Sequence, residues 1–239
     1  MSELAGSHPQ LAAGLPRGRG RRPLDEVNSE QQVRILRAAI AAIAEVGYHA
    51  STIGDIVRRA RVSREAFYRN YPGKLECFVA AVKMGQSIVL PRVAQAVERT
   101  QDADLPTALR SIVTEYLCVC ASEPEFARAW ALELATAASE GTAELRNGYL
   151  DALAEVIRAA HLSRGRLGGQ AHRERPFEYY VALVGGCQEL IYRYIIAGRT
   201  REVGELEEPI FNFLLQGLMN RPEGYVAKER SPHRASRSR

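Results

Sequence analysis

The feature that most constrains the fold is a stretch of two short helical segments joined by a brief turn, residues 51–74, STIGDIVRRARVSREAFYRNYPGK. Thr52 and Ser63 are residue types that begin helices as N-caps, and Pro72-Gly73 stops the second segment. Helices this short are unstable alone, so both segments must pack their apolar residues against a neighbouring helix. The pattern predicts a helix-turn-helix, and an ordinary three-helix bundle with short loops is the alternative.

A longer helix precedes this stretch and supplies the apolar surface that it needs. We expect Ser29 to begin this helix, with Gln32 completing a capping box, and Gly47 to end it. Apolar residues recur between them at steps of three and four, which places them on one face. Lys74 is expected to open a further helix. Because no stretch alternates between apolar and polar residues as a half-buried strand does, the sequence predicts an all-α protein.

The outer face of the second short helix distinguishes a DNA reader from an ordinary bundle. A solvated face usually mixes charges of both signs, whereas this face carries one acid, Glu65, among four other polar residues. The four are Arg64, Tyr68, Arg69 and Asn70. Arg binds guanine edges or phosphates, Asn pairs with adenine, and a Tyr hydroxyl can reach a phosphate oxygen. The face therefore suits the major groove of DNA.

Charge is distributed unevenly along the chain, whose formal net charge is +4. Residues 28–90 hold nine Lys or Arg against five Asp or Glu, whereas residues 91–219 hold thirteen against eighteen. This asymmetry favours a polyanionic partner for the first of these regions only. Residues 1–27 and 221–239 are polar and basic, and we expect both to be disordered.

Residues 51–78, STIGDIVRRARVSREAFYRNYPGKLECF, together with the preceding helix RAAIAAIAEVGYHAST, resemble the TetR family of transcriptional regulators. The resemblance covers roughly residues 29–80 and rests on the order, spacing and type of the residues. Two positions depart from the family pattern. Arg61 stands where a turn glycine is usual, which predicts backbone strain or an altered turn. Gly54 stands where some members have a base-contacting side chain, so more of the base reading is expected from the second short helix.

The resemblance implies two domains and two sets of DNA contacts. The expected division is a disordered basic arm (1–27), a helix-turn-helix DNA-binding domain (28–80), a helical regulatory and dimerisation domain (81–220) and a disordered basic tail (221–239). Phe67 and Tyr71 are expected in the core. The residues expected at base edges are Arg64, Glu65, Ala66 and Arg69. Those expected at phosphates are Thr52, Tyr68, Asn70 and Lys74.

The arm ahead of this domain contains PRGRGRRP, residues 16–23. Flexible Arg-Gly segments can enter the narrow minor groove of A·T tracts, where the electrostatic potential is most negative. The residues expected there are Arg17, Arg19, Arg21 and Arg22. A solubilising tail is the alternative.

In the acidic remainder we expect helices near 91–101, 106–121, 124–137, 143–162, 177–198 and 205–219, with residues 161–176 as a loop. The helix over 177–198 is expected to form the homodimer interface, because Gly185 and Gly186 permit close helix approach and a two-fold DNA reader needs a two-fold protein. The interface residues expected are Leu183, Gly186, Leu190 and Tyr194. The alternative is that this helix is simply the domain core.

A pocket for a small hydrophobic effector is expected among the middle helices. Four aromatic residues could line it: Tyr116, Phe126, Trp130 and Tyr149. Ordinary core packing is the alternative for each, because aromatic residues at helical spacing are more often core.

The sequence contains none of the common catalytic fingerprints for nucleotide, hydrolase or metalloprotease sites. Its five His residues form no metal-spaced pair, and its four Cys residues form no CxxC pair, so we expect no metal, no cofactor and a reducing cytoplasm. No apolar run approaches the ~20 residues of a membrane span. The sequence thus predicts a homodimeric, ligand-responsive repressor that binds a palindrome in double-stranded DNA. An architectural DNA-binding protein without a ligand switch is the alternative, and an enzyme using the second domain is a remoter one.

Overall fold

The computed structural model describes residues 24–134, 137, 140–167 and 174–219. These residues form helices and no strand, as the sequence predicts. In chain order the elements are α1 (Leu24–Val46), α2 (Ile53–Ala60), α3 (Arg64–Asn70), α4 (Lys74–Glu98), α5 (Leu105–Ser122), α6 (Pro124–Arg128), the π-helical turn η2 (Ala129–Glu133), α8 (Glu140–Leu167), α9 (Phe177–Ile196), the 3-10 segment η3 (Thr200–Leu206) and α10 (Glu207–Met219). The arm arginines Arg17, Arg19, Arg21 and Arg22 and the tail lie outside the described residues.

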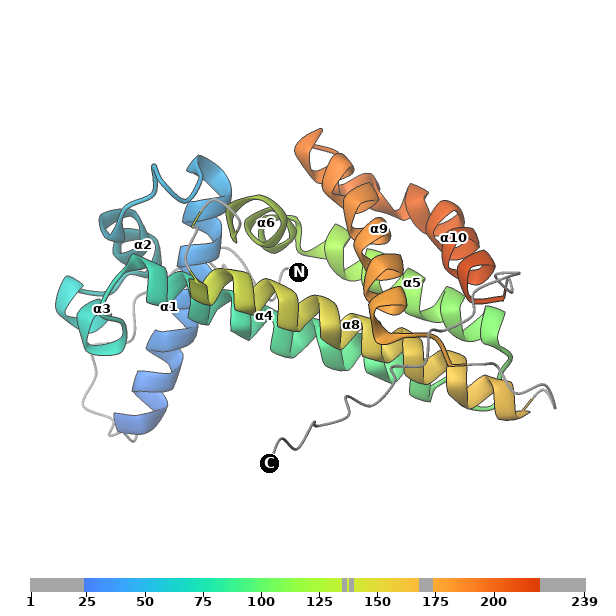
Figure 1. Ribbon diagram of the computed structural model, residues 1–239. Helices are drawn as coiled ribbons and strands as arrows, with labels where there is room; N and C mark the ends of the chain where they lie inside the picture. Colours follow the sequence, from blue (N-terminus) through green and yellow to red (C-terminus); the bar gives the residue numbers. More distant parts are fainter. Residues whose placement is uncertain (1–23, 135–136, 138–139, 168–173, 220–239) are drawn as a thin grey trace, which may run out of the picture.

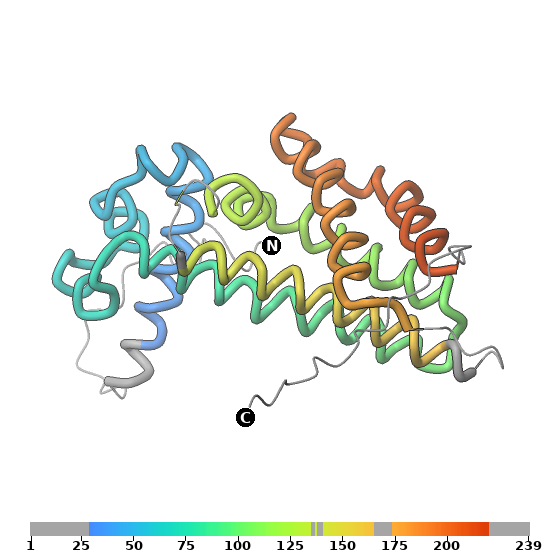
Figure 2. Tube along the Cα trace, viewed as in Figure 1, coloured from blue at the N-terminus to red at the C-terminus, as the bar shows by residue number. Residues whose placement is uncertain are grey.

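Helices α1, α2 and α3 gather at one end of the molecule, and α4 runs from them along its length beside α8 (Figure 1). Helices α9 and α10 lie toward the other end, where α9 packs on α8 and α10 packs on α5. Within the α1–α3 unit, α1 packs on α4, α6 and η2 (Figure 2). The loop that follows α1 adds further contacts with α4 and η2.

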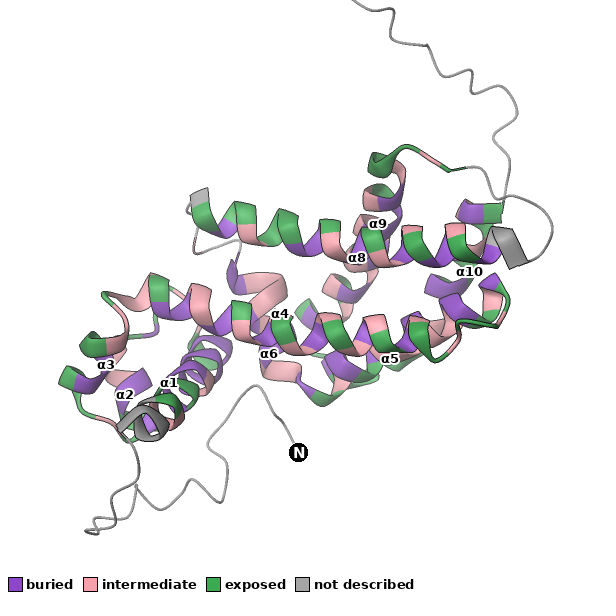
Figure 3. Ribbon diagram, turned by 90° about the horizontal axis from the view of Figure 1, so that it is seen from below, coloured by how far each residue is buried: buried purple, intermediate pink, exposed green. Residues whose placement is uncertain are grey.

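The apolar residues of α1–α3 pack with the start of α4, in a core that continues into the second region. Ile40 and Ile43 from α1, Ile56 from α2, Phe67 from α3 and Phe78 from α4 are fully buried. Figure 3 shows the consequence along the chain, with buried positions turned inward on each helix and exposed positions turned out. The apolar stripe expected of the first helix is buried at Leu36, Ile40 and Ile43, whereas Val33 near its start is 40% exposed.

The structure corrects two expected helix boundaries near the N-terminal end. Helix α1 begins at Leu24 rather than near Ser29, because the sequence after Pro23 places acidic residues in the first turn, where the helix dipole favours them. Helix α4 is continuous from Lys74 to Glu98 through Pro91, where a new helix was expected. Burial of Val89 and Val93 on either side of the proline holds the helix together there.

The loop expected over residues 161–176 is also wrong in its first part, because α8 continues to Leu167. His161 and Arg164 are buried. The Nδ1 atom of His161 lies 2.9 Å from the Tyr180 hydroxyl, and Arg164 Nη2 donates hydrogen bonds to carbonyl oxygens at the end of α4, those of Val97 (3.0 Å) and Thr100 (2.8 Å). These tertiary contacts extend the helix beyond the point where its apolar pattern fades.

Helix α4 is also the one helix of the described residues that is long and apolar enough to cross a membrane by length and composition. Eight of its residues are buried inside the protein, among them Phe78, Val82 and Val93. The central helix of a water-soluble domain meets the same criteria, so this finding is weak evidence for a membrane span.

Gly85 of α4 packs very closely against Phe126 of α6. A Cβ placed on Gly85 would lie 1.9 Å from a ring carbon of Phe126, well inside any real contact. Gly85 is therefore required for the Phe126 ring to pack against α4, and this contact positions α6 beside the N-terminal unit.

We expect Gly85→Ala to lower the free energy of unfolding by about 1–3 kcal/mol, because the added methyl overpacks the α4–α6 contact. Gly148→Ala is the matched control, since Gly148 lies on exposed helix surface with no atom within 4 Å of an added Cβ. The control should gain up to about 1 kcal/mol from helix propensity. Urea unfolding measures both, and equal stability of the two variants would contradict this packing.

Candidate nucleic-acid interface and effector cavity

The turn between α2 and α3 has the geometry of a helix-turn-helix, with a strained residue where glycine is usual. Arg61 adopts φ 54° and ψ 46°, the left-handed conformation, and its N–H donates to the carbonyl of Arg58 at 3.3 Å. It is the one non-glycine residue with positive φ in the described chain. The sequence-based expectation of strain at this position is confirmed, since a side chain in this conformation costs about 1–2 kcal/mol.

Both short helices begin with the caps that the sequence predicts. The Thr52 hydroxyl accepts from the Asp55 N–H (3.1 Å), and Asp55 Oδ2 accepts from the Thr52 N–H (3.1 Å), which is a complete capping box. The Thr52 hydroxyl also donates to Asp55 Oδ2 at 2.7 Å, and this bond, together with the bond from the Thr52 N–H, holds the pKa of Asp55 below its usual value. The Ser63 hydroxyl accepts from the Ala66 N–H at 3.0 Å and starts α3.

The outer face of α3 carries four of the predicted DNA-contacting residues at the surface. Arg64, Glu65, Tyr68 and Arg69 are all exposed, with Tyr68 at 53%. Arg69 and Glu65 form an exposed ion pair at 3.3 Å, which water weakens and a nucleic acid could displace. Gly54 on α2 lies beside Arg64, whose Nη2 would be in ordinary van der Waals contact, at 3.5 Å, with a Cβ added at this position.

Two other predicted contact residues are engaged within the protein. Ala66 is 6% exposed and faces the core, so the expectation that its methyl meets a base edge is wrong. It lies next to Phe67 on the buried side of a two-turn helix. Asn70 Nδ2 donates to the Ala66 carbonyl at 2.7 Å and so closes the end of α3. Phe67 is fully buried, and Tyr71 packs beside it with burial raising the pKa of Tyr71 to about 12.

Lys74, predicted to contact phosphate, holds the loop between α1 and α2. Its Nζ donates to the carbonyls of Tyr48 (2.5 Å) and Ser51 (2.8 Å) and lies 4.3 Å from the centre of the Tyr48 ring. Burial lowers the pKa of Lys74. This role could not be read from the sequence, because it joins residues that are more than twenty positions apart.

Residues of η2 and α6 also form hydrogen bonds with this loop and with the end of α1. Glu133 of η2 is 8% exposed, and its Oε2 accepts from the Tyr48 N–H at 2.8 Å. Arg128 of α6 donates from Nε to the Ala44 carbonyl at 2.9 Å, at the end of α1. We call the contacts of Lys74 and Glu133 with residues 47–51 the loop clamp. It connects the helix-turn-helix to both α4 and η2.

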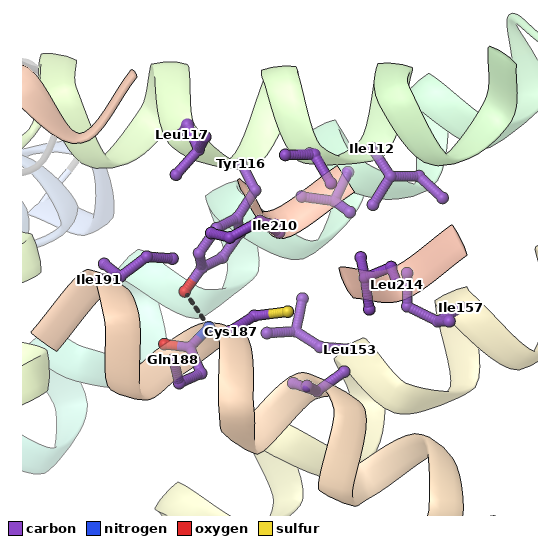
Figure 4. A pocket seen from close by; sticks show the side chains of 13 residues that line it. Ile112, Tyr116, Leu117, Leu153, Ile157, Cys187, Gln188, Ile191, Ile210 and Leu214 are labelled. Atoms are coloured by element: carbon purple, nitrogen blue, oxygen red, sulfur yellow. Dashed lines mark hydrogen bonds between the residues drawn. The ribbon is translucent and has the colours of Figure 1, made fainter. Parts of the chain in front are cut away.

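The second region holds two small, mainly apolar cavities and a larger, more open and more polar pocket. The open pocket measures about 500 Å³ and is lined by Arg99, Pro106, Thr107, Arg110, Ser111, Thr114, Glu115 and Phe211. The first small cavity, about 50 Å³, is almost wholly apolar and lies among α4, α5, α8, α9 and α10 (Figure 4). It is lined by Val93, Ile112, Val113, Tyr116, Leu117, Leu153, Ile157, Val184, Cys187, Gln188, Ile191, Ile210 and Leu214. Among the predicted pocket residues, Tyr116 alone lines it. The aliphatic lining was missed, although its i, i+4 spacing on α5, α8 and α10 was visible in the sequence.

The second cavity, about 20 Å³, is lined by all four predicted aromatic residues: Tyr116, Phe126, Trp130 and Tyr149. The rings of Trp130 and Tyr149 meet edge to face with centres 4.4 Å apart. Tyr116, Gln188 and Ile191 line both cavities and therefore form the wall between them.

The helix predicted to dimerise has one buried and one open face. Leu183 is 6% exposed and packs inside its own chain against Gly217, so the expectation that it lies in an interface is wrong. Gly186, Leu190 and Tyr194 are half-buried. The Tyr194 hydroxyl donates to Glu205 at 3.1 Å. Exposed residues on α9 and α10 instead define an open face, with the apolar members Ala182, Ile196, Phe213 and Met219 and the charged members Glu189 and Arg193.

The part of the chain that the structure describes holds no group of three or more His, Cys, Asp or Glu residues placed to bind a metal ion. Cys77, Cys118, Cys120 and Cys187 are free thiols. Burial raises the pKa of Cys77, Cys120 and Cys187 to about 12, so these thiols are unreactive.

Comparison with known proteins agrees with this architecture. Residues 35–81 match the family described as bacterial regulatory proteins, tetR family. Over 102 residues the chain is 30% identical to the HTH-type transcriptional activator FasR of Mycolicibacterium smegmatis, a match that covers 43% of this chain and about half, 47%, of FasR. It is 22% identical over 196 residues to the fatty acid metabolism regulator protein of Bacillus subtilis, covering 79% of this chain and 96% of that protein.

Solved structures show the same fold. FadR from Bacillus halodurans, a fatty acid degradation regulator, aligns with a TM-score of 0.66 at 21% identity over 77% of this chain and 98% of its own. FadR from Bacillus subtilis in complex with stearoyl-CoA aligns with a TM-score of 0.67 at 19% identity over 77% and 97%. Residues 35–81 thus match the helix-turn-helix of the tetR family, and the chain shares the fold of these solved structures. Its relatives are named as regulators and not as enzymes.

We expect Lys74→Met to lower the free energy of unfolding by about 1–3 kcal/mol, because it leaves two loop carbonyls without their charged donor. Lys83→Met, at an exposed position on the same helix, removes the same charge and should leave stability unchanged. Chemical unfolding decides between the two roles of Lys74. Unchanged stability with uniformly weaker DNA binding would favour the phosphate contact and contradict the clamp.

Proposed function

We propose that this protein is a ligand-responsive repressor that binds an inverted repeat in double-stranded DNA as a homodimer, in the cytoplasm. The observation that carries the proposal is the exposed, mainly basic face of α3 mounted on a helix-turn-helix of the tetR family. Arg64, Glu65 and Arg69 are proposed to read base edges in the major groove. Thr52 and Tyr68 are proposed to bind phosphates, and Asn70 and Lys74 to shape the surface from within.

The open face of α9 and α10 supports the homodimer. Ala182, Ile196 and Phe213 are exposed on adjacent helices. An added Cβ on Gly185 would meet no atom within 4 Å, so a partner helix could approach closely there. Burial of such an apolar face against its own copy gives the two-fold symmetry that an inverted repeat requires. We include the half-buried Gly186, Leu190 and Tyr194 at the edges of this interface.

The effector is proposed to be a compound with a long acyl chain. The first cavity is lined by aliphatic side chains, which suits a hydrocarbon tail and offers little to a polar ligand. FadR from Bacillus subtilis has been solved with stearoyl-CoA, and two relatives carry names from fatty acid metabolism. Stearoyl-CoA is therefore the first probe to use.

The loop clamp offers a path from the effector to DNA. Trp130 lines the second cavity and belongs to η2, the same short turn that carries Glu133. An effector that displaces Trp130 would shift Glu133 and loosen its hold on Tyr48. Because the clamp orients α2 and α3, we propose that loosening it misplaces the two reading helices of the dimer.

Selection from random DNA duplexes tests the proposed DNA reading directly. The wild-type protein should enrich an inverted repeat. Arg64→Ala should lose about 1–3 kcal/mol of binding free energy and relax the preference at one base position in each half-site. Arg201→Ala removes an exposed charge from η3, far from the helix-turn-helix, and should enrich the same sequence as wild type.

Two outcomes would contradict this account of DNA binding. Retention of DNA without any enriched sequence favours the architectural alternative. Enrichment of an identical motif by Arg64→Ala would show that Arg64 does not read bases. Transcription in vitro from a promoter carrying the selected site then determines the sign of regulation, and a repressor reduces the transcript.

We expect Glu133→Ala to reduce the release of DNA by stearoyl-CoA at least about fivefold, which is the lower end of typical coupling between sites. Glu133→Gln is the matched control, because its amide oxygen can still accept from the Tyr48 N–H and should preserve most of the response. Fluorescence anisotropy of labelled operator DNA, titrated with stearoyl-CoA, measures both. Equal responses of Glu133→Ala and wild type would exclude this path.

A further inference from the structure

The two cavities are too small, as they stand, for the proposed ligand. Together they offer about 70 Å³, from about 50 Å³ and about 20 Å³, whereas pockets that hold small molecules usually measure about 300–1,000 Å³. A long hydrocarbon chain must therefore enlarge the first cavity or join it to the second. The wall that the two cavities share decides how easily they join.

The polar part of this wall is one hydrogen-bonded pair. Gln188 Nε2 on α9 donates to the Tyr116 hydroxyl on α5 at 2.8 Å, and the two side chains point toward each other across the apolar space (Figure 4). Burial raises the pKa of Tyr116 well above its usual value, so the phenol is neutral at physiological pH. Ile191, the third residue that lines both cavities, is apolar, and its side chain forms no hydrogen bond that a ligand would break.

Separation of this pair has a cost that depends on the ligand. A hydrocarbon inserted between them breaks the bond that Gln188 donates and offers its amide N–H nothing in return. The Tyr116 hydroxyl keeps its hydrogen-bonded contact with Tyr149, which lines the second cavity. A chain short enough to remain in the first cavity leaves the bond intact. The cost therefore falls only on chains that pass into the second cavity.

We propose that the Tyr116–Gln188 pair is a gate that sets the acyl-chain length to which this regulator responds. The proposal rests on the proposed function, in which the effector carries an acyl chain. Short chains occupy the first cavity and leave the gate closed. Long chains open it and reach the second cavity, where Phe126 of α6 and Trp130 of η2 form the wall nearest the loop clamp.

The gate thus makes two properties depend on length. Affinity for long chains is reduced by the cost of opening the gate, and only long chains contact the elements that connect with α1. Short chains are expected to bind without releasing DNA. Short acyl compounds would then leave DNA binding unchanged even when they occupy the first cavity.

The test is a binding series with saturated acyl-CoA thioesters from octanoyl-CoA to stearoyl-CoA, measured by titration calorimetry on the full-length protein. The double variant Tyr116→Phe/Gln188→Leu removes both polar groups with little change of volume. It should bind stearoyl-CoA about two- to tenfold more tightly than wild type, the value of one net hydrogen bond, and octanoyl-CoA equally well. Tyr179→Phe is the matched control, since its hydroxyl donates to the Gly217 carbonyl outside both cavities.

Ala131→Leu supplies an independent test from the far side of the gate. Ala131 lines the second cavity but not the first. The larger leucine side chain should therefore weaken stearoyl-CoA binding and leave octanoyl-CoA binding unchanged. This variant keeps the gate residues, and it remains informative if the double variant fails to fold.

The outcomes separate the gate from the ligand class. If the wild-type protein binds acyl-CoA but the double variant and Ala131→Leu both keep its length profile, the gate is wrong and the acyl effector stands. If the wild-type protein binds no acyl-CoA of any length, the ligand class is wrong and the gate falls with it. The gate is supported if the double variant binds stearoyl-CoA more tightly, Ala131→Leu binds it more weakly, and both bind octanoyl-CoA as the wild type does.

Discussion

The structure depends on how the loop between α1 and α2 is held. Lys74 donates to two carbonyls of this loop, and Glu133 accepts from one of its N–H groups. The loop itself is too short and polar to fix the angle between the two helices. Because α2 and α3 follow directly from it, the orientation of the reading face is set by residues of α4 and η2, outside the helix-turn-helix. The proposed DNA-binding surface therefore depends on residues outside the helix-turn-helix.

In the proposed account, the same contacts connect the second region with the first. Helix α1 packs on α4, α6 and η2, and Gly85 allows Phe126 to bring α6 close to α4. Phe126 and Trp130 line a cavity on one side, while Arg128 and Glu133 bind the end of α1 and its loop on the other. One short segment, residues 124–133, thus both lines the second cavity and contacts α1 and the loop that follows it. In the proposed account, an effector acts on DNA binding through this segment.

The sequence predicted local features well and long-range ones poorly. The all-α fold, the caps at Thr52 and Ser63 and the strain at Arg61 follow from neighbouring residues, and they are present. The family resemblance placed Ala66 at a base edge, and Leu183 was placed in the dimer interface as part of the apolar area of its helix. Both side chains are buried within the chain. The extension of α8 to Leu167 and the role of Lys74 depend on partners far along the chain. The aromatic pocket residues were found, but the aliphatic cavity beside them resembled ordinary core.

Amide hydrogen exchange at Tyr48, with and without stearoyl-CoA, tests the central claim most directly. The Tyr48 N–H donates to Glu133 and so reports the state of the clamp itself. The account predicts slow exchange in the free protein and clearly faster exchange with stearoyl-CoA, while the buried amide of Ile40 in α1 keeps its protection. If stearoyl-CoA released DNA and Tyr48 remained equally protected, the effector would act by another route and the account would be wrong.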